Sequence, residues 1–148
     1  MKIIDTPEIY DWGVLEKAFE TAEGYHGVCI LGGVGHRCGY VGLPKDHALY
    51  GASYDSLWMI NIHGGLTYAG DGIIEDETSY HYVGFDCAHA GDAKDIKALK
   101  EYGLNMEYSA VSTGTHIWTL DEVVEEIKKL STQLTPEALM RVKMEGEE

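Results

Sequence analysis

The sequence predicts an α+β fold in which an antiparallel β-meander of about five strands has N-terminal and C-terminal helices packed on it. Short strand-like runs between residues 25 and 85 are separated by glycine-rich turns. Apolar residues recur at helical spacing near both ends of the chain. The length of 148 residues fits a single globular domain over residues 1–148, with 45% hydrophobic residues and a last few residues that we expect to fray.

The first predicted helix covers residues 7–23. Pro7 suits the first helical position, because its missing N–H would have no partner there. Gly24 ends the pattern. The apolar residues that recur at helical spacing are Ile9, Trp12, Leu15 and Phe19.

The clearest helix lies near the C-terminus, over residues 120–134. Thr119 and Glu122 have the spacing of a capping box, in which each side chain accepts a hydrogen bond from the other residue's backbone N–H. Thr135 and Pro136 predict the start of a second short helix. The apolar stripe of the long helix consists of Leu120, Val123, Val124, Ile127, Leu130 and Leu134.

The expected strands lie between these helices. The Gly64–Gly65 pair is a strong hairpin signal. Residues 94–103 predict a short helix or an irregular crossing, and residues 106–111 a further strand. The strands of the meander are expected at residues 25–31, 38–43, 57–63, 66–69 and 80–85.

Two segments should converge at one end of this sheet. The third strand ends at the glycine pair, the fourth leaves it and the fifth returns towards it. We therefore expect Asp86, Cys87 and His89 to lie close to His63, with the side chains of His63, Asp86 and His89 within about 10 Å of one another.

Composition excludes several classes of function. The formal charge is −14, from 25 acidic and 11 basic residues, which disfavours non-specific binding to nucleic acid or anionic membranes. No apolar run approaches the roughly 20 residues that span a bilayer, and the first seven residues lack the apolar core of a signal peptide. Three cysteines without a CxxC pair argue against a disulfide scaffold. We expect a cytoplasmic protein without membrane partners.

The converging segments contain side chains that can carry protons or hold a metal. His63, Asp86 and His89 are candidates for acid–base catalysis, because histidine titrates near neutrality and a carboxylate can orient it. Cys87 is an alternative nucleophile. Zinc or another divalent metal would find donors in His63, Cys87, His89 and Asp92, although their spacing matches no zinc motif, so the cofactor stays open.

Binding without chemistry is an equally open interpretation. Aromatic rings beside glycine turns hold small polar ligands and nucleotides by stacking and by backbone N–H groups. Each residue taken alone also has a structural explanation, such as Asp86 capping a loop and Asp92 capping a helix. The candidate ligand-binding residues are Tyr40, His63, Gly64, Gly65, Thr67, Tyr68, Asp86, Cys87, His89 and Asp92.

Three ordered motifs resemble those of a group of small uncharacterised proteins that bacteriophages and prophages often encode. The motifs are Cys38–Pro44 (CGYVGLP), His63–Tyr68 (HGGLTY) and Gly84–Asp92 (GFDCAHAGD), and the similarity covers roughly residues 25–130. The resemblance implies a context, namely a phage-type accessory protein in a bacterial host cytoplasm. By analogy with small phage proteins that capture or degrade nucleotide signals, it implies an anti-defence role.

Three functional hypotheses follow. The leading one is binding of a small polar, nucleotide-derived ligand between the His63–Gly64–Gly65 turn and the Asp86–Asp92 loop, which would sequester a host defence signal. The first alternative is a hydrolase that uses His63, Asp86 and His89, with or without a divalent metal. The second is a module that binds a host protein through the aromatic loop around Tyr50 and Tyr54. A homo-oligomer is compatible with each hypothesis.

Overall fold

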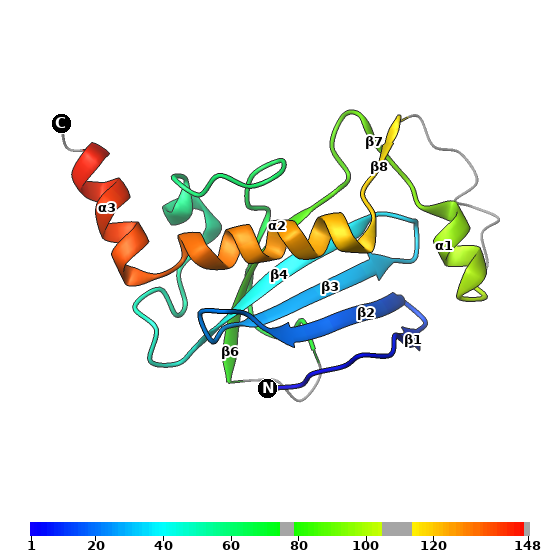
Figure 1. Ribbon diagram of the computed structural model, residues 1–148, viewed down its shortest axis with the longest axis horizontal. Coiled ribbons are helices and arrows are strands. Elements are labelled where there is room, and N and C mark those ends of the chain that lie inside the picture. Colours follow the sequence, from blue (N-terminus) through cyan, green and yellow to red (C-terminus); the bar gives the residue numbers. More distant parts are fainter. Residues whose placement is uncertain (75–78, 105–113, 147–148) are drawn as a thin grey trace.

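Six antiparallel strands form one sheet in the computed structural model, in the order β1-β2-β3-β4-β6-β5 (Figure 1). The structure describes residues 1–74, 79–104 and 114–146. The strands of this sheet are β1 (Glu8–Tyr10), β2 (Gly13–Glu20), β3 (His26–Gly32), β4 (Arg37–Pro44), β5 (Tyr68–Gly70) and β6 (Tyr80–Asp86). A parallel pair, β7 (Asp92–Ala93) and β8 (His116–Ile117), stands apart from it, and the helices are η1 (Tyr54–Leu57), α1 (Ile96–Glu101), α2 (Leu120–Gln133) and α3 (Pro136–Gly146).

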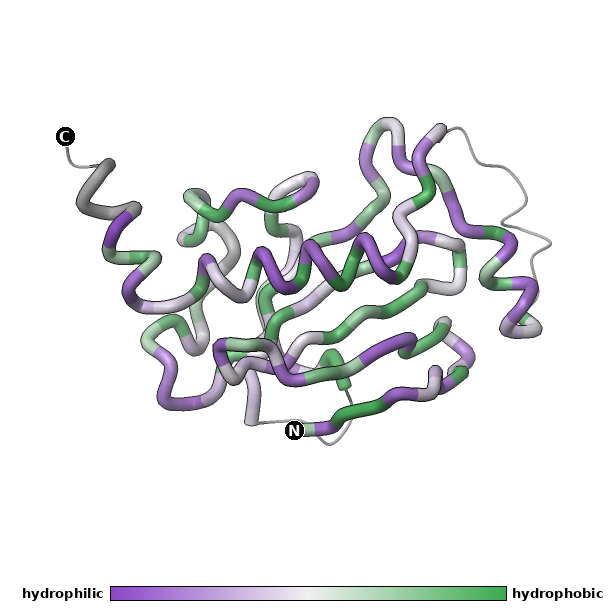
Figure 2. Tube along the Cα trace, in the orientation of Figure 1, coloured by the Kyte–Doolittle hydropathy of each residue, from purple (hydrophilic) through white to green (hydrophobic). Residues whose placement is uncertain are grey.

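Helix α2 lies across one face of the sheet, over β3 and β4 (Figure 1). Apolar and polar residues alternate along its turns (Figure 2), so that one side of the helix is apolar. Gly39 lets the helix approach closely, because a Cβ at this position would lie 2.9 Å from Ile127. The core between the helix and the sheet includes Cys29, Val41, Leu43, Val83, Phe85, Val123, Ile127, Leu130 and Leu134.

The sequence signals of the C-terminal helices are confirmed. Thr119 and Glu122 form the complete capping box at the start of α2. Thr135 Oγ1 accepts from the N–H of Ala138 at 3.2 Å, which caps α3. Four residues of the predicted stripe within α2 are buried, namely Val123, Val124, Ile127 and Leu130.

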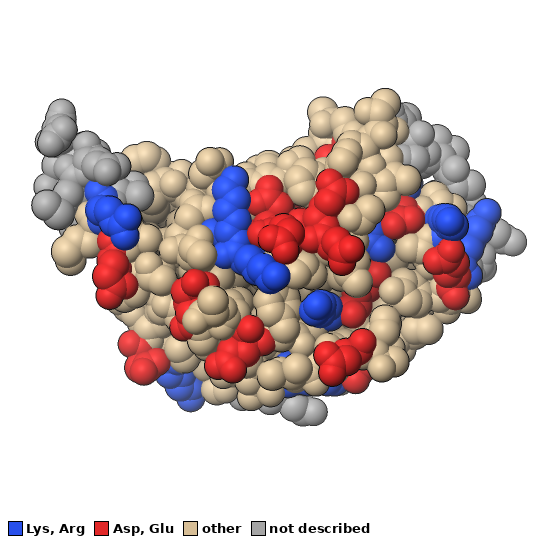
Figure 3. Space-filling model, in the orientation of Figure 1, with Lys and Arg blue, Asp and Glu red and all other residues tan. Residues whose placement is uncertain are grey.

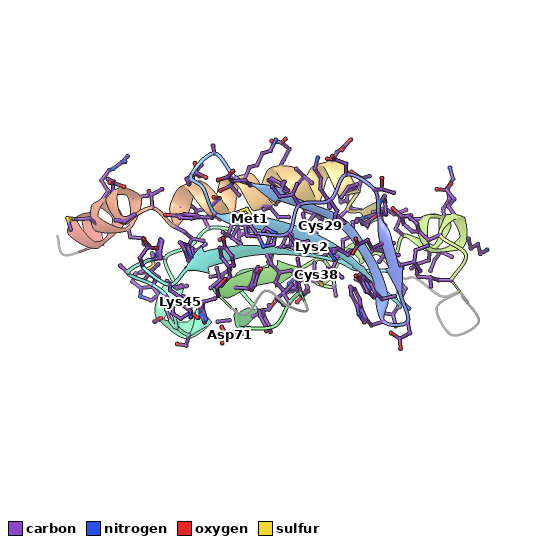
Figure 4. All side chains as sticks on the ribbon, turned by 90° about the horizontal axis from the view of Figure 1, so that it is seen from below. Met1, Lys2, Cys29, Cys38, Lys45 and Asp71 are labelled. Carbon is purple, nitrogen blue, oxygen red and sulfur yellow. The ribbon has the colours of Figure 1, made fainter. Side chains whose placement is uncertain are left out.

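A second apolar cluster covers the opposite face of the sheet. It includes Ile4 from the N-terminal segment and Ile74 from the segment after β5, and both pack with Leu15, Val28 and Tyr82. Cys29, labelled in Figure 4, belongs instead to the α2 core on the other face of the sheet. Both faces of the sheet are therefore covered in part, which explains why β2 and β3 are buried almost throughout.

The predicted helix over residues 7–23 is wrong, because this segment forms the hairpin of β1 and β2. Gly13 has φ +145°, and a Cβ there would overlap the carbonyl oxygen of Leu31 in the neighbouring strand β3. This position at the start of β2 therefore requires glycine. Glu16 in β2 is 3% exposed, and its carboxylate pairs with Arg37.

The predicted strand over residues 57–63 is also wrong. This segment begins in η1 and continues without strand pairing, although Ile60 and Ile62 pack in the α2 core. Its backbone is satisfied by a side chain instead of a strand, since the Gln133 amide donates to the Asn61 carbonyl and accepts from the Asn61 N–H, both at 2.7 Å. Alternation in a strand would place Trp58 on the same face as Ile60, but Trp58 is 79% exposed whereas Ile60 is buried.

The remaining predictions of secondary structure have mixed outcomes. The other four meander strands correspond to β3, β4, β5 and β6, and residues 94–103 contain helix α1. The strand predicted over residues 106–111 lies outside the described residues. Within the described part of the chain, no helix has both the length and the apolar character needed to cross a membrane. The α+β class with an antiparallel sheet is confirmed.

Candidate functional site

The expected convergence is observed at the end of β6. Asp86 is the last residue of this strand, His89 lies in the following loop, and Asp92 begins β7. His63 reaches the same place from the loop after η1. The His63 and His89 rings meet edge to face, with centroids 5.7 Å apart. The proximity does not depend on the strand that was wrongly predicted, because the glycine turn after His63 still delivers the chain to β5, the neighbour of β6.

The first component of the site is a pair formed by His63 and Asp92. Nε2 of His63 lies 2.8 Å from Oδ2 of Asp92, and the Asp92 side chain is only 4% exposed. Asp92 also accepts from the His89 backbone N–H at 3.0 Å and from Nε1 of Trp118 at 3.0 Å. Burial would raise the pKa of Asp92, but these hydrogen bonds outweigh it and hold the pKa below its usual value. Asp92 is therefore an ionised, fixed acceptor for the His63 ring.

The second component is a pair formed by His89 and Asp86, with Nε2 of His89 3.2 Å from Oδ1 of Asp86. The geometry is that of an ion pair and lacks the alignment of a hydrogen bond. Asp86 is held by the hydroxyl of Thr67 at 3.0 Å and by the N–H of Ala88 at 3.1 Å. The His89 and Asp86 side chains are 35% and 30% exposed, so this pair is the more open of the two.

The glycine turn determines where these rings can lie. Gly64 and Gly65 have φ of +68° and +78°, in the left-handed region that favours glycine. A Cβ at Gly64 would overlap the His89 ring, whereas a Cβ at Gly65 would have no neighbour within 4 Å. The space beside Gly64, which we expected a ligand to use, is thus filled by the His89 ring. Open space remains beside Gly65.

Several predicted ligand-binding residues instead pack or form hydrogen bonds within the protein. Tyr40 and Tyr68 pack edge to face on each other, with centroids 5.6 Å apart, in the cluster on the sheet face opposite α2. Thr67 is bonded to Asp86, as described above. Cys87 is 1% exposed and packs in the α2 core. Among the titratable side chains proposed for the site, His63, Asp86 and His89 remain partly accessible, and Gly64, Gly65 and Thr67 beside them are also not buried.

His63, His89 and Asp92 lie close together but are not arranged as a metal site. Among the described residues, no group of three or more His, Cys, Asp or Glu side chains is arranged to hold a metal ion. Burial, together with the charge of Asp92, raises the pKa of Cys87 well above its usual value. The thiol is therefore neutral near pH 7, which argues against Cys87 as a nucleophile.

Trp118 is the residue that sequence reasoning missed at this site. Its indole stacks beside His63, with ring centroids 4.2 Å apart and planes 33° apart, while its N–H bonds Asp92. Trp118 lies just before the capping box of α2, so the well-defined start of that helix fixes its position. Trp118 lies one residue before the predicted N-cap Thr119, and this position in the sequence could have indicated that its side chain is held in a fixed place.

A buried ion cluster around Arg37 fixes the backbone of Trp118. Arg37 is 5% exposed and pairs with Glu16 at 2.6 Å and with Asp95 at 2.6 Å. Nη1 of Arg37 also donates to the Trp118 carbonyl oxygen at 2.9 Å, and the Arg37 carbonyl accepts from the Cys87 N–H at 2.9 Å. One buried arginine thus connects β2, β4, the loop after β6 and the segment before α2.

The surroundings of the site are acidic. On the face that carries α2, acidic side chains gather over the first half of the helix and basic ones lie further along it (Figure 3). The site itself has two histidines opposite two carboxylates, so it has no excess positive charge for a polyanion. Comparisons of the chain with protein-family models, curated proteins and solved structures gave no match. The function must therefore be argued from the geometry.

Proposed function

We propose that this protein hydrolyses a small polar, nucleotide-derived molecule by general acid–base catalysis at His63 and His89. The observation that carries the proposal is the pair of adjacent imidazoles, 5.7 Å apart, each of which faces its own carboxylate. A proton acceptor and a proton donor placed side by side are what hydrolysis requires when water attacks and an oxygen leaves.

His63 is assigned as the base. An ionised carboxylate can only accept, so Nε2 of His63 carries the hydrogen that faces Asp92, and Nδ1 is the acceptor of the neutral ring. Nδ1 would take a proton from water while the water oxygen bonds to the reacting centre. Asp92 keeps the ring in this tautomer and stabilises the imidazolium that forms, as an orienting carboxylate does.

His89 is assigned as the acid. In its protonated form the ring has an N–H on each nitrogen, and Nε2 lies 3.2 Å from Oδ1 of Asp86 as an ion pair without hydrogen-bond alignment. The proton on Nδ1 would pass to the leaving oxygen as its bond to the reacting centre breaks. The greater exposure of this pair suits contact with a leaving group, while the more buried His63 pair suits activation of one water molecule.

The class of substrate rests on the resemblance of the three motifs to phage-type accessory proteins. In that context the substrate is a nucleotide signal of host defence in the bacterial cytoplasm. The site has no excess positive charge, which disfavours a nucleic-acid strand, so the choice of a small nucleotide rests on the resemblance alone.

The test is turnover of a panel of cyclic and linear mono- and dinucleotides, followed by chromatography. His63→Gln and His89→Gln should each lower the rate by roughly 100-fold or more. His47→Gln is the matched control, because His47 bonds the Leu134 carbonyl at the opposite end of α2 from Trp118 and should keep the wild-type rate. Loss of activity in all three variants, or in none, would contradict the assignment.

Asp86→Asn separates hydrolysis from simple capture. Asparagine keeps the shape and one acceptor oxygen but loses the charge. We expect turnover to fall by roughly 100-fold while affinity for the substrate changes by about 1 kcal/mol. Wild-type protein that binds a nucleotide tightly and releases no product would replace the hydrolase with a sequestering protein at the same site.

The binding of a host protein is supported by a separate observation. Trp58 in the loop that follows η1 is 79% exposed, which is unusual for a large aromatic side chain. Aromatic residues of this kind anchor protein interfaces. Trp58→Ser should abolish co-purification of such a partner from host extract while leaving nucleotide turnover unchanged.

A further inference from the structure

A pocket lies away from the His63 and His89 site and shares no residue with it. Its volume is about 440 Å³, within the range of roughly 300–1,000 Å³ that is usual for small-molecule sites. Leu15 and Ile74, which belong to the cluster on the sheet face opposite α2, are part of its lining. The other lining residues are Lys2, Tyr10, Asp11, Trp12, Gly72 and Ile73.

Two aromatic rings give this pocket a flat wall. Tyr10 and Trp12 stack with centroids 5.0 Å apart and planes within 8° of parallel. Trp12 is 46% exposed, so a large part of the indole is open to a ligand. The backbone that carries it is fixed, because the Trp12 carbonyl accepts from the Gly33 N–H at 3.0 Å and Gly13 holds the tight turn into β2. An ordered ring with an open surface is a stacking platform that costs little to organise.

The charges around the pocket decide which ligand fits. Nζ of Lys2 lies 2.8 Å from Oε1 of Glu8, which also accepts from the Tyr10 hydroxyl at 2.7 Å. Lys2, the one cation among the described lining residues, is thus neutralised, and Asp11 adds a negative charge. An anionic phosphate would meet no net positive charge here. A carboxylate rim instead favours a ligand that donates N–H groups.

We propose that this pocket binds an uncharged planar heterocycle with an exocyclic amine, of the adenosine type. The ring stacks on Trp12, its apolar edge lies against Leu15 and Ile74, and its amine donates to Asp11. Stacking of a base on an aromatic side chain tolerates many bases, and the carboxylate adds the preference for an amine over a carbonyl. This pocket would select the base of a nucleoside independently of any reaction at His63.

The test is calorimetric titration of the full chain with adenosine. Wild-type protein should bind it saturably, and Trp12→Leu should weaken binding at least tenfold. Trp58→Leu is the matched control, because Trp58 is 79% exposed and lies outside the pocket, so its variant should bind as the wild type does. Circular dichroism on both variants establishes that each is folded.

A second variant keeps the test informative if Trp12→Leu does not fold. Asp11→Asn should weaken binding of adenosine several-fold and should reduce its preference over inosine, which has a carbonyl in place of the amine. The proposal is overturned if wild-type protein shows no saturable binding up to millimolar adenosine. It is equally overturned if Trp12→Leu binds as tightly as the wild type, or if Trp58→Leu loses binding to the same extent.

Discussion

Replacement of Gly64 by alanine tests the arrangement of the two histidines, with Gly65→Ala as its matched control. Both glycines have positive φ, which costs a non-glycine residue roughly 1–2 kcal/mol. They differ in their surroundings, because a Cβ at Gly64 would overlap the His89 ring and a Cβ at Gly65 would meet open space. The overlap is with the far end of the half-exposed His89 side chain, so its cost is the loss of the His89–Asp86 pair, roughly 0–1 kcal/mol for an exposed ion pair.

We therefore expect Gly64→Ala to lower the free energy of unfolding by about 1–3 kcal/mol and Gly65→Ala by about 1–2 kcal/mol. Urea unfolding, followed by circular dichroism, measures both values. Side-chain NMR of the histidines gives the second readout, since only Gly64→Ala should displace His89 from Asp86. Equal destabilisation with identical histidine spectra would refute the placement of His89 over the turn.

Three further predictions concern the core, the helix cap and the dependence on pH. Ile127→Ala should cost about 2–5 kcal/mol in urea unfolding, because Ile127 is fully buried against Gly39, which has no side chain to fill the space; Lys129→Ala, on the exposed side of α2, should stay within about 0.5 kcal/mol. Thr119→Ala should cost about 1 kcal/mol through loss of the capping box, and an unchanged midpoint would show that the cap contributes nothing. The pKa of Asp92 is lower in the folded state than in the unfolded state, so its contribution to stability is complete above the unfolded value of about 4 and is lost as the pH falls through the folded value. Acid titration of Asp92→Asn should accordingly show a shallower loss of stability below pH 4 than wild type, and parallel curves would contradict this.

Local signals in the sequence predicted the parts of the fold that depend on local physics. The capping box and apolar stripe of α2 are complete within the helix, so no tertiary information was needed to find them. The hairpin of β1 and β2 was mistaken for a helix because Ile9, Trp12, Leu15 and Phe19 recur at helical spacing. A register shift between Leu15 and Lys17 also interrupts the alternation that would have indicated a strand. The same error concealed the pocket beside Trp12, because a helix over residues 7–23 would have placed the Trp12 side chain in the core.

The candidate site was predictable in part. The proximity of His63, Asp86 and His89 followed from the glycine turn and the strand that ends at Asp86. Sequence reasoning paired His63 with Asp86, whereas the structure pairs it with Asp92. This choice depends on Trp118, which comes from the approach to α2 and fixes the Asp92 carboxylate. Spacing along the chain gives no information on which of two nearby carboxylates an imidazole will face.

The most direct test of the acid–base account is the pH dependence of kcat/KM for the nucleotide that the wild-type protein hydrolyses. One histidine must be neutral and the other protonated, so the wild-type profile should be bell-shaped. His63→Gln should lose the acidic limb, which reports the base, and His89→Gln should lose the basic limb, which reports the acid. A wild-type profile without two limbs, or variants whose residual activity keeps both, would contradict the central claim that these two imidazoles act as a base and an acid.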